Sequence, residues 1–468
     1  MDVKVASHVT FLGHGYEQSI KTQKNLSECA HGNYSAEMTY RVIHMAWSVL
    51  FVKLIFPCNT PAMCASKKIH LLFHDAGGGH RNAALALKAL CEQQGRPWEL
   101  NLVQFQELTD HLDVLRRLTG IRIQEQYNTL LRNGWTWGSE YLLRVLQATI
   151  WVFHKPMVKL LAKHWKANPG DLLISVIPHF NREISESWQL TNPGKPFVTI
   201  ITDLADFPPR FWIEPIAEQK IVAGTERAAE QARTFGKTDA SLFQASGMIL
   251  RPEFYAEQTE TPGKIRAEIG LDGQTPTAIV LFGGYGSNVI YDIVEQLDAA
   301  KLPLQMILIC GKNEKLAERL RARKWNLKLH VVGFTREVNR FMRAADFLIG
   351  KPGPGSIAEA MVSGLPVLVE CNSSTLPQER YNTEWVKEKN VGVVVRNFRR
   401  DVAAAVRGLL QPGRLEELRR NVAGQHNRAV FEIADYLGTL LGDQSRSANG
   451  ETLNSAAERI VTAGSAQK

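Results

Sequence analysis

The chain has 468 residues, of which 44% are hydrophobic and 22% are charged. This composition excludes a disordered chain, and the length suffices for two domains, since one core seldom serves more than about 250–300 residues. The net charge of +8 favours anionic partners such as acidic lipids, phosphorylated substrates or nucleic acid. No basic motif interleaved with aromatic residues supports nucleic-acid binding. The cysteines form no CxxC pair, which is typical of reduced thiols in a cytosolic protein.

The first apolar stretch, residues 42–57, contains His44 and Lys53. It is shorter than the about 20 residues that a membrane-spanning helix needs. A polar stretch precedes it, which is unlike a signal peptide. Because a well-formed strand begins only after Met63, we expect translation to start there and residues 1–62 not to be part of the native protein. We assign residues 1–66 to an N-terminal extension that is non-native or disordered. N-terminal sequencing of the native protein tests this expectation.

From residue 68 onward, short apolar runs alternate with helical patterns. In the first set we predict a helix at residues 81–94 and strands at residues 69–74, 172–177, 197–201 and 220–223. In the second set we predict strands at residues 278–282, 304–310, 328–332, 346–349, 366–369 and 391–395. Such runs between helices indicate parallel sheets covered on both faces. The predicted fold class is α/β, with two doubly wound, Rossmann-like domains facing a cleft and ligands beyond the carboxyl ends of the strands.

Glycine-rich segments follow the first strand of each set, at residues 75–80 (DAGGGH) and 283–287 (GGYGS). Glycine lets the backbone approach a phosphate closely, and the following helix offers N–H groups and a positive dipole end. A plain tight turn is the alternative. An enzyme that uses a nicotinamide dinucleotide usually has an acid at the end of the next strand. Here those strands end in Gln104-Phe105-Gln106 and Cys310-Gly311-Lys312, which argues against that class.

A third glycine element, residues 351–356 (KPGPGS), precedes a helix predicted at residues 357–363. A helix that begins after Gly-Pro-Gly-Ser can bind a pyrophosphate through backbone N–H groups and the Ser356 hydroxyl. We expect Glu359 in the first turn, where its carboxylate can accept both hydroxyls of a ribose. The alternative is that Glu359 only complements the helix dipole.

Two segments, residues 77–81 (GGGHR) and 351–360 (KPGPGSIAEA), resemble monogalactosyldiacylglycerol synthases and related bacterial diacylglycerol glycosyltransferases. These belong to glycosyltransferase family 28, of which the peptidoglycan N-acetylglucosaminyltransferase is a more distant member. The resemblance covers most of residues 68–440. It includes residues 175–179, 202–204, 247–255, 333–334 and 378–382. Unlike plant-type members, the chain has no histidine after Thr202-Asp203-Leu204.

The resemblance implies a GT-B fold and an inverting transfer of a hexose, galactose or glucose, from a UDP-sugar to diacylglycerol or a related lipid. Residues 67–250 would form the acceptor- and membrane-binding domain and residues 251–441 the UDP-sugar-binding domain. Residues 442–468, which are polar and rich in serine, glycine and alanine, would be a disordered tail.

The resemblance also implies the donor-binding residues. The backbone at Phe334 would face the uracil, Glu359 would bind the ribose, and Arg251 would neutralise the diphosphate. Gln378 and Glu379 would meet the sugar hydroxyls, with Asn382 supporting them. The pyrophosphate would rest on Gly353, Pro354, Gly355, Ser356 and Ile357, and the glycine loops add Gly79, Gly283, Gly284 and Gly286.

An inverting transfer needs a base for the acceptor, charge stabilisation on the leaving UDP and exclusion of water. His80 is the first candidate base, since a helix N-terminus lowers the pKa of a histidine and keeps it neutral. Its other possible roles are to orient the acceptor, cap the helix or touch a donor phosphate. Asp203 is the second candidate and Asp75 the third. No acidic pair has metal-binding spacing beside the donor residues, so we expect no metal or other cofactor.

Residues 112–166 are predicted to be a helical insertion that ends in a basic amphipathic segment without acids, residues 154–166. Lys155, Lys159 and Lys163 share one side of it, and Trp165 lies on the apolar side. Such a helix can lie in an anionic lipid interface, where Trp135, Trp137 and Trp151 would add interfacial rings. The alternative is a core helix with a solvated lysine face. The first interpretation predicts a peripheral protein on the cytoplasmic face of a membrane.

Three other functions fit parts of the pattern. One is transfer of N-acetylglucosamine to a polyprenyl-linked acceptor. Another is a UDP-sugar epimerase of similar fold, which would need a different acid/base set. The third is a nucleotide-sugar-binding protein without catalysis, against which the presence of His80, Glu359 and Gln378 argues.

Overall fold

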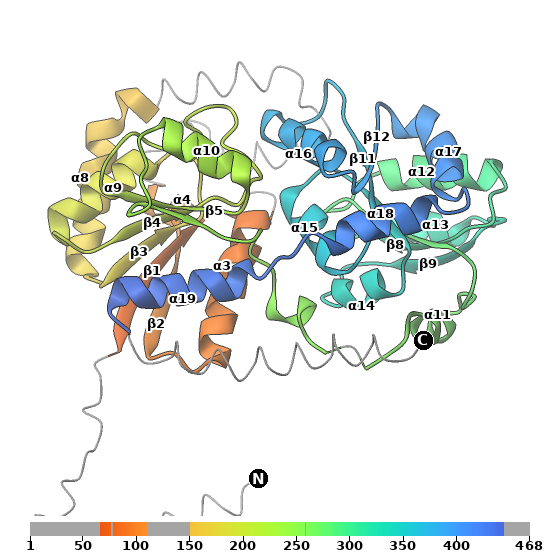
Figure 1. Cartoon of the computed structure of the whole chain (residues 1–468), viewed down its shortest axis with the longest axis horizontal. Coiled ribbons are helices and arrows are strands. Elements are labelled where there is room, and N and C mark those ends of the chain that lie inside the picture. Colours follow the sequence, from red (N-terminus) through yellow and green to blue (C-terminus); the bar gives the residue numbers. More distant parts are fainter. Residues whose placement is uncertain (1–65, 76–77, 110–149, 258, 444–468) are drawn as a thin grey trace, which may run out of the picture. The chain divides into compact units, whose positions relative to one another are not determined.

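The structure, a computed structural model, describes residues 66–75, 78–109, 150–257 and 259–443. Two parallel six-stranded sheets, each covered by helices, make up this part of the chain (Figure 1). The predicted α/β class with two doubly wound sheets is therefore confirmed.

The first sheet has the strand order β2-β1-β3-β4-β5-β6. Its strands are β1 (Lys67–Phe73), β2 (Trp98–Gln104), β3 (Leu172–Ser175), β4 (Phe197–Ile200), β5 (Gln219–Ala223) and β6 (Leu242–Gln244). The four strands predicted in this half are confirmed to within a few residues. The edge strand β6 was not predicted, because so short a run has no recognisable alternation.

Helices cover both faces of the first sheet. They are α3 (Gly79–Gln93), α4 (Phe105–Thr109), α8 (His154–Ala167), α9 (Asn181–Thr191) and α10 (Glu226–Thr234). Leu87 of α3 packs on one face, together with Leu71 of β1. On the other face, Trp165 of α8 and Trp188 of α9 pack against Leu173 of β3.

The second sheet has the strand order β12-β11-β10-β7-β8-β9. Its strands are β7 (Thr277–Leu281), β8 (Gln305–Ile309), β9 (Lys328–Val332), β10 (Phe347–Gly350), β11 (Val367–Glu370) and β12 (Gly392–Val395). All six predicted strands are confirmed, β9 with the predicted bounds. Nearly continuous runs of apolar residues explain this success, since strands buried on both faces need such runs.

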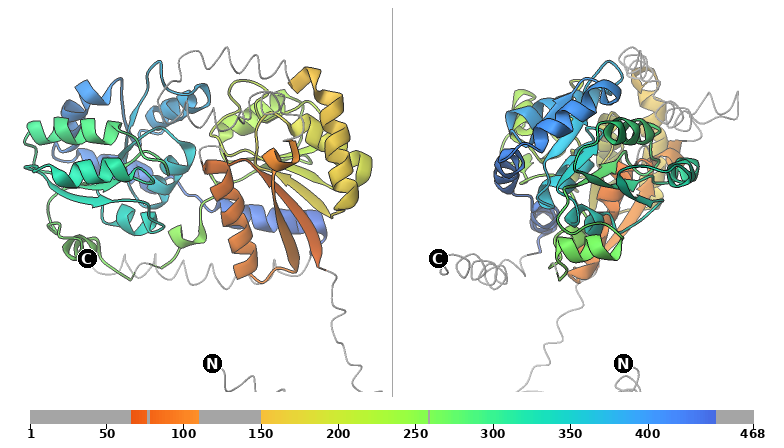
Figure 2. Two further views of the ribbon diagram at one scale, coloured as in Figure 1. Left: turned by 180° about the vertical axis from the view of Figure 1, so that it is seen from behind. Right: turned by 90° about the vertical axis from the view of Figure 1, so that its right-hand side faces the viewer.

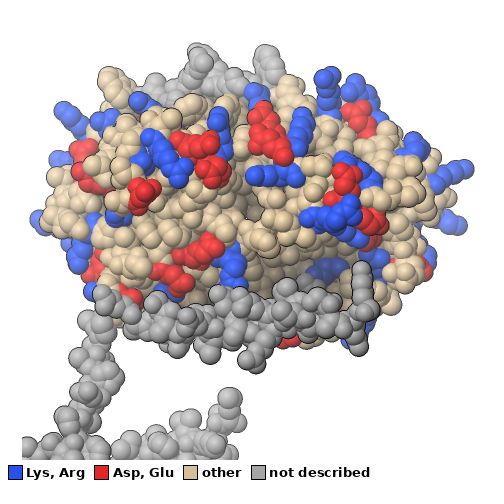
Figure 3. All heavy atoms as spheres, in the orientation of Figure 1, with Lys and Arg blue, Asp and Glu red and all other residues tan. Residues whose placement is uncertain are grey.

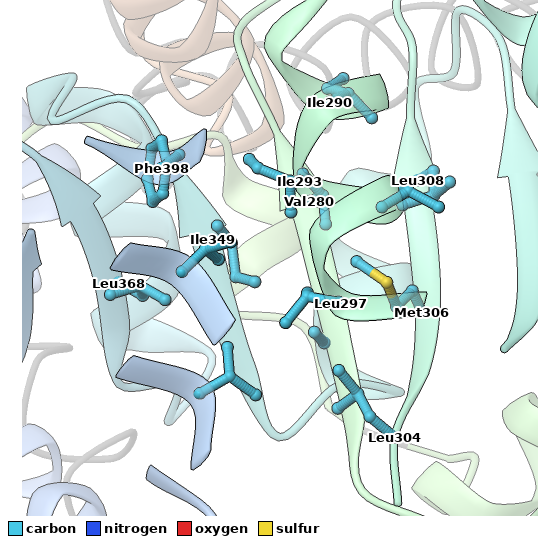
Figure 4. Packing of buried hydrophobic residues seen from close by; sticks show 14 of the residues in the cluster. Val280, Ile290, Ile293, Leu297, Leu304, Met306, Leu308, Ile349, Leu368 and Phe398 are labelled. Atoms are coloured by element: carbon cyan, nitrogen blue, oxygen red, sulfur yellow. The ribbon is translucent and has the colours of Figure 1, made fainter. Parts of the chain in front are cut away.

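The helices of this half bury its sheet in the same way. They are η3 (Pro252–Phe254), α11 (Pro262–Glu268), α12 (Val289–Ala299), α13 (Glu314–Ala322), α14 (Val338–Arg343), α15 (Pro354–Val362), α16 (Pro377–Glu388), α17 (Phe398–Leu409) and α18 (Arg414–Ala423). Figure 4 shows Ile293 and Leu297 of α12 in one cluster with Val280 of β7, Leu308 of β8 and Phe398 of α17.

The last helix of the described residues, α19 (Ala429–Leu441), packs on the first sheet. Val430, Ile433 and Leu437 lie in the same cluster as residues of β1 and β3, and α19 runs beside α3 (Figure 2). The Trp98 indole N–H donates to Asp443, at 2.8 Å. The predicted assignment of all residues 251–441 to the second domain is therefore wrong for this helix. An amphipathic pattern predicts a buried face but not the sheet that covers it.

The strand orders place the functional loops. In the second sheet the chain runs from β7 outward to β9 on one side, then returns to β10 on the other side of β7. In the first sheet, β1 likewise lies between β2 and β3. Loops that leave such a switch point run in opposite directions and open a crevice at the carboxyl ends of the strands. The site is therefore expected after β7 and β10, and after β1 and β3.

Candidate functional site

The loop after β7 carries Gly283, Gly284 and Gly286. Gly283 and Gly286 have φ angles of +73° and +68°, the left-handed region that favours glycine. A Cβ on Gly286 would lie 2.1 Å from the Cys310 carbonyl oxygen, so packing on the loop after β8 requires glycine there. A Cβ on Gly284 would meet nothing within 4 Å. The backbone at Gly283 and Gly284 is thus approachable, whereas Gly286 has a structural reason to be glycine.

The loop after β10 leads into α15, which begins at Pro354, earlier than predicted. Proline at the first helical position has the φ angle that a helix needs, which explains the early start. Gly353 is the N-cap residue and supplies no side-chain cap. The N–H groups of Gly355 and Ser356 belong to the first turn, which lacks intrahelical acceptors. This arrangement can hold an anion, and Ile357 follows it as a buried residue of the helix.

Glu359 lies in the second turn of α15, so the prediction of the first turn is wrong. The helix dipole acts mainly within the first turn, and complementing it is therefore a weak explanation for this acid. Burial raises the pKa of Glu359 to about 7, and the positive charge of Arg251 opposes that rise. Arg251 also donates to the Arg336 carbonyl oxygen, at 3.1 Å. Arg251 and Glu359 therefore lie close enough to interact.

A third group lies where α16 meets this loop. The carboxylate of Glu379, which is 8% exposed, accepts a bond from the Lys351 ammonium at 3.0 Å. Asn382 is fully buried and donates to the Pro352 carbonyl oxygen at 2.8 Å, which ties α16 to the start of α15. Gln378 precedes Glu379 and is half-buried. Sequence reasoning did not assign Lys351 to the site, although a lysine between a buried strand and a glycine-rich turn is a usable signal.

Exposed aromatic rings line the loops after β7 and β9. Phe334 is 59% exposed and Tyr285 is 37% exposed. The Lys312 ammonium lies 5.9 Å from the Phe334 ring and 5.5 Å from the Tyr285 ring. Apolar rings usually avoid water, so two exposed rings beside one lysine form a surface that suits a flat, polar ring such as a nucleobase.

The carboxyl end of the first sheet holds His80, in the first turn of α3. Its Nδ1 lies 3.0 Å from the Thr202 hydroxyl, and its ring packs on Trp212. Burial, reinforced by nearby His74, lowers the pKa of His80 to about 3. The histidine is therefore neutral near pH 7, as predicted, but burial rather than the helix terminus is the main cause. Gly79 precedes it and has open space around it.

Asp203 follows β4 and is 6% exposed. Its carboxylate accepts the Trp212 indole N–H at 2.9 Å. Asp206 fixes this tryptophan, because its own carboxylate accepts the Trp212 backbone N–H at 2.7 Å. Burial raises the pKa of Asp203 to about 7 despite the bond from Trp212. Trp212, which sequence reasoning did not single out, thus contacts both candidate bases.

Two observations connect the halves of the site. The charges of Glu379 and Lys351 act on the Asp203 carboxyl, the first raising its pKa and the second lowering it. Leu204, beside Asp203, packs in one apolar cluster with Ala358, beside Glu359. Asp75, the third candidate base, has a side chain that is 38% exposed and pairs with Arg81 at 3.4 Å. The structure therefore brings Asp203 within electrostatic reach of Lys351 and Glu379.

The predicted membrane face is only partly exposed. Trp165 is fully buried and its indole N–H donates to Ser187, so its assignment to a lipid interface is wrong. A tryptophan on the apolar side of an amphipathic helix can pack in a protein core or lie in a lipid interface. Here Trp165 packs in the core of the first sheet. Trp151 is 77% exposed. Lys155, Lys159 and Lys163 are also exposed. Trp135 and Trp137 lie outside the described residues.

The net positive charge is not gathered on the face seen in Figure 3, where basic and acidic side chains are interspersed. Among the described helices, none is long and apolar enough to cross a membrane. Within residues 66–75, 78–109, 150–257 and 259–443, no three histidine, cysteine or acidic side chains are placed to hold a metal ion together.

The chain is similar to several known proteins. Residues 278–430 match the glycosyltransferase family 28 C-terminal domain. The chain is 28% identical to monogalactosyldiacylglycerol synthase 1 of Arabidopsis thaliana, over 72% of this chain and 63% of the plant protein. It is also 28% identical to the monogalactosyldiacylglycerol synthase of Spinacia oleracea, over 82% of this chain and 74% of that protein.

Solved structures show the same arrangement of two sheets. Acinetobacter baumannii MurG superimposes with a TM-score of 0.50 at 13% identity, over 80% of this chain and 99% of MurG. S. aureus MnaA in complex with UDP gives 0.51 at 15% identity, over 81% of this chain and 97% of MnaA. Matches at such low sequence identity show the fold alone. This fold is GT-B, as predicted.

Proposed function

Because this chain carries a glycosyltransferase family 28 C-terminal domain in a GT-B fold, we propose that it is an inverting hexosyltransferase. It moves galactose or glucose from a UDP-sugar to diacylglycerol or a related membrane lipid. The observation that carries this proposal is the group of residues that follows β7 and β10. The N-terminus of α15 has no side-chain cap and suits a diphosphate, Lys351 and Arg251 can balance its charge, and the half-buried acid Glu359 suits a ribose.

The donor lies with its diphosphate on the N–H groups of Gly355 and Ser356, and with Arg251 and Lys351 near its charge. Glu359 accepts the ribose hydroxyls, and the exposed ring of Phe334 covers the uracil. Gln378 and Glu379 meet the sugar, whereas buried Asn382 holds their helix in place. These contacts stabilise the UDP that leaves, since helix N–H groups and cations oppose the charge that develops on it.

We propose that Asp203, rather than His80, is the general base that accepts the proton of the acceptor hydroxyl. A general base works best when its pKa lies near the working pH. The pKa of Asp203 is raised to about 7, whereas that of His80 is lowered to about 3, which makes the imidazole a weak proton acceptor. His80 then orients the acceptor as a neutral hydrogen-bonding group.

The test is to incubate the protein with diacylglycerol and a panel of UDP-sugars, and to analyse the lipids by mass. We expect a single-hexose glycolipid from UDP-galactose or UDP-glucose, with inversion at the anomeric carbon. Transfer only from UDP-N-acetylglucosamine to a polyprenyl-linked acceptor would instead support the second transferase. Interconversion of UDP-sugars without any acceptor would support an epimerase, and either result would refute the proposal.

The proposed reaction uses no divalent metal, since helix N–H groups, Arg251 and Lys351 can balance the charge of the leaving diphosphate. We therefore expect glycolipid formation to stay within about twofold after treatment with a chelator, because no step of the charge balance depends on a cation from solution. Complete loss in the chelator and recovery with magnesium would contradict this. A chelated, magnesium-dependent enzyme assayed in parallel controls for the treatment.

The exposed lysines of α8 are proposed to attract an anionic membrane. Replacing Lys155, Lys159 and Lys163 together by glutamine should weaken binding to vesicles with anionic lipid about 100-fold, at about 1 kcal/mol per lysine near the surface. The matched control replaces three exposed lysines of the second half, Lys301, Lys324 and Lys328. Equal losses in both triple variants, or binding that does not depend on salt, would contradict a specific role for α8.

A further inference from the structure

Lys351 directly follows β10, and its side chain lies beside the loop after β7. Its ammonium is 3.0 Å from Glu379. A Cβ on Gly283 would lie 3.7 Å from the Lys351 Cε, and a Cβ on Gly353 would lie 3.8 Å from its Nζ. The lysine side chain therefore passes between the loop after β7 and the start of α15, on which we place the diphosphate.

The two partners of this ion pair differ in exposure. The Lys351 side chain is 39% exposed, whereas the Glu379 side chain is 10% exposed. A ligand beside these two segments can therefore reach the ammonium more readily than the carboxylate. A buried carboxylate is stable only when charges or hydrogen bonds compensate it, so Glu379 needs a new donor whenever Lys351 turns away.

We propose that Lys351 exchanges partners during the reaction. In the free enzyme it pairs with Glu379. When a UDP-sugar binds, the ammonium turns to the diphosphate, and the carboxylate of Glu379 accepts hydroxyls of the sugar that is transferred. This inference rests on the proposed function and assigns Lys351 as the residue that couples recognition of the diphosphate to recognition of the sugar.

The chemistry of both groups suits such an exchange. A lysine ammonium has three donors on a flexible stem, so it can follow an anion without a fixed geometry. A diphosphate carries more negative charge than one carboxylate and competes well for the cation. Sugar hydroxyls then satisfy Glu379 with hydrogen bonds, whereas UDP alone leaves it without a new partner.

The exchange of partners by Lys351 also changes the pKa of Asp203, which follows β4 of the first sheet. The charge of Lys351 favours the ionised form of Asp203, and that of Glu379 opposes it. When the diphosphate neutralises the ammonium, the effect of Lys351 on Asp203 weakens, and the pKa of Asp203 rises. Binding of the donor thus makes the carboxylate of Asp203 a stronger base for the acceptor hydroxyl.

The test compares the binding of UDP and of uridine by calorimetry in Lys351→Met, Lys351→Arg and the parent protein. We expect Lys351→Met to weaken UDP binding about 10–100-fold, the range for a lost hydrogen bond to a charged group, and to leave uridine binding within about twofold. Lys351→Arg should keep most of the affinity for UDP. Lys315→Met, an exposed lysine of α13, is the matched control and should change neither.

The variant Glu379→Gln distinguishes an exchange of partners by Lys351 from a permanent ion pair between Lys351 and Glu379. If Lys351 leaves Glu379 for the diphosphate, removing the carboxylate should tighten UDP binding several-fold and should not tighten UDP-sugar binding. A fixed pair predicts that Lys351→Met and Glu379→Gln weaken UDP and uridine alike. That result, or unchanged UDP affinity in Lys351→Met, overturns the inference.

Lys351→Met leaves a buried carboxylate unpaired and can fail to fold, so the double variant Lys351→Met/Glu379→Gln provides a neutral pair. It should bind UDP about as weakly as Lys351→Met and much more weakly than Glu379→Gln. Equal affinity in the double variant and in Glu379→Gln overturns the inference. If the parent protein binds neither UDP nor uridine, the proposed function itself fails.

Discussion

Replacing Asp203 by asparagine should lower kcat for glycolipid formation about 10²–10⁴-fold, the range for loss of a general base. The amide keeps the shape of the side chain and can still accept the Trp212 indole N–H, so UDP affinity should change little. His80→Gln should act mainly on the KM for the acceptor. The measurement is steady-state kinetics of both variants with UDP affinity as the control.

The pH profile distinguishes the two candidate bases. A base with a pKa raised to about 7 is active when ionised, so the rate should rise with pH through 7 and level off above it. A base whose pKa is lowered to about 3 would be active across the whole neutral range. A rate that stays constant from pH 8 to pH 5, or full activity in Asp203→Asn, would show that Asp203 is not the base.

Stability provides an independent control on the same variant. An unfolded aspartate ionises near pH 4, whereas folded Asp203 ionises near pH 7, so folding is opposed by its charge above pH 4 and most strongly above pH 7. Asp203→Asn should therefore unfold at a higher temperature than the parent at pH 8, with the difference vanishing near pH 4. The gain in unfolding free energy has an upper limit of about 4 kcal/mol, from about 1.4 kcal/mol for each unit of pKa.

Glu359→Gln should weaken UDP binding about 100-fold, since two hydrogen bonds from ribose hydroxyls to a carboxylate are each worth about 1.5–3 kcal/mol before losses to water. The side chain is partly buried, so water replaces these bonds poorly. Because burial raises the pKa of Glu359 to about 7, the parent protein should bind UDP more tightly at pH 8 than at pH 6. In Glu359→Gln this dependence on pH should disappear.

A dideoxy analogue of UDP without the two ribose hydroxyls completes the experiment. The parent should lose as much affinity for the analogue as the variant loses for UDP, and the variant should lose nothing further. Additive losses would mean that Glu359 acts elsewhere, for instance on Arg251. Normal binding of UDP by Glu359→Gln would show that Glu359 does not bind the ribose.

Most of the fold follows from local pattern. Strands buried on both faces need apolar, β-branched runs, so the six strands of the second sheet could be placed from residues such as Val280 and Leu308. The edge strand β6 and the start of α15 were harder, because they depend on one short pairing and on the conformation of Gly353 and Pro354. The place of α19 depends on tertiary contacts and has no local signal.

The site was predictable where glycines and charges follow a strand. The loops after β1, β7 and β10 were found in this way, and strand order then explains why those after β7 and β10 meet. The ion pair of Lys351 with Glu379 and the contacts of Trp212 join residues distant in sequence, so no spacing reveals them. Burial of Trp165 was missed because its helix is equally suited to a core and to a lipid surface.

The return of α19 to the first sheet limits how this enzyme can be divided or recombined. A fragment that ends near residue 250 would expose the apolar surface on which Val430, Ile433 and Leu437 pack, and such patches promote aggregation. Chimeras that exchange the second sheet and its helices between related enzymes therefore need two junctions, one before η3 and one before α19. In such a chimera α19 must come from the same parent as the first sheet, because the two share one apolar cluster.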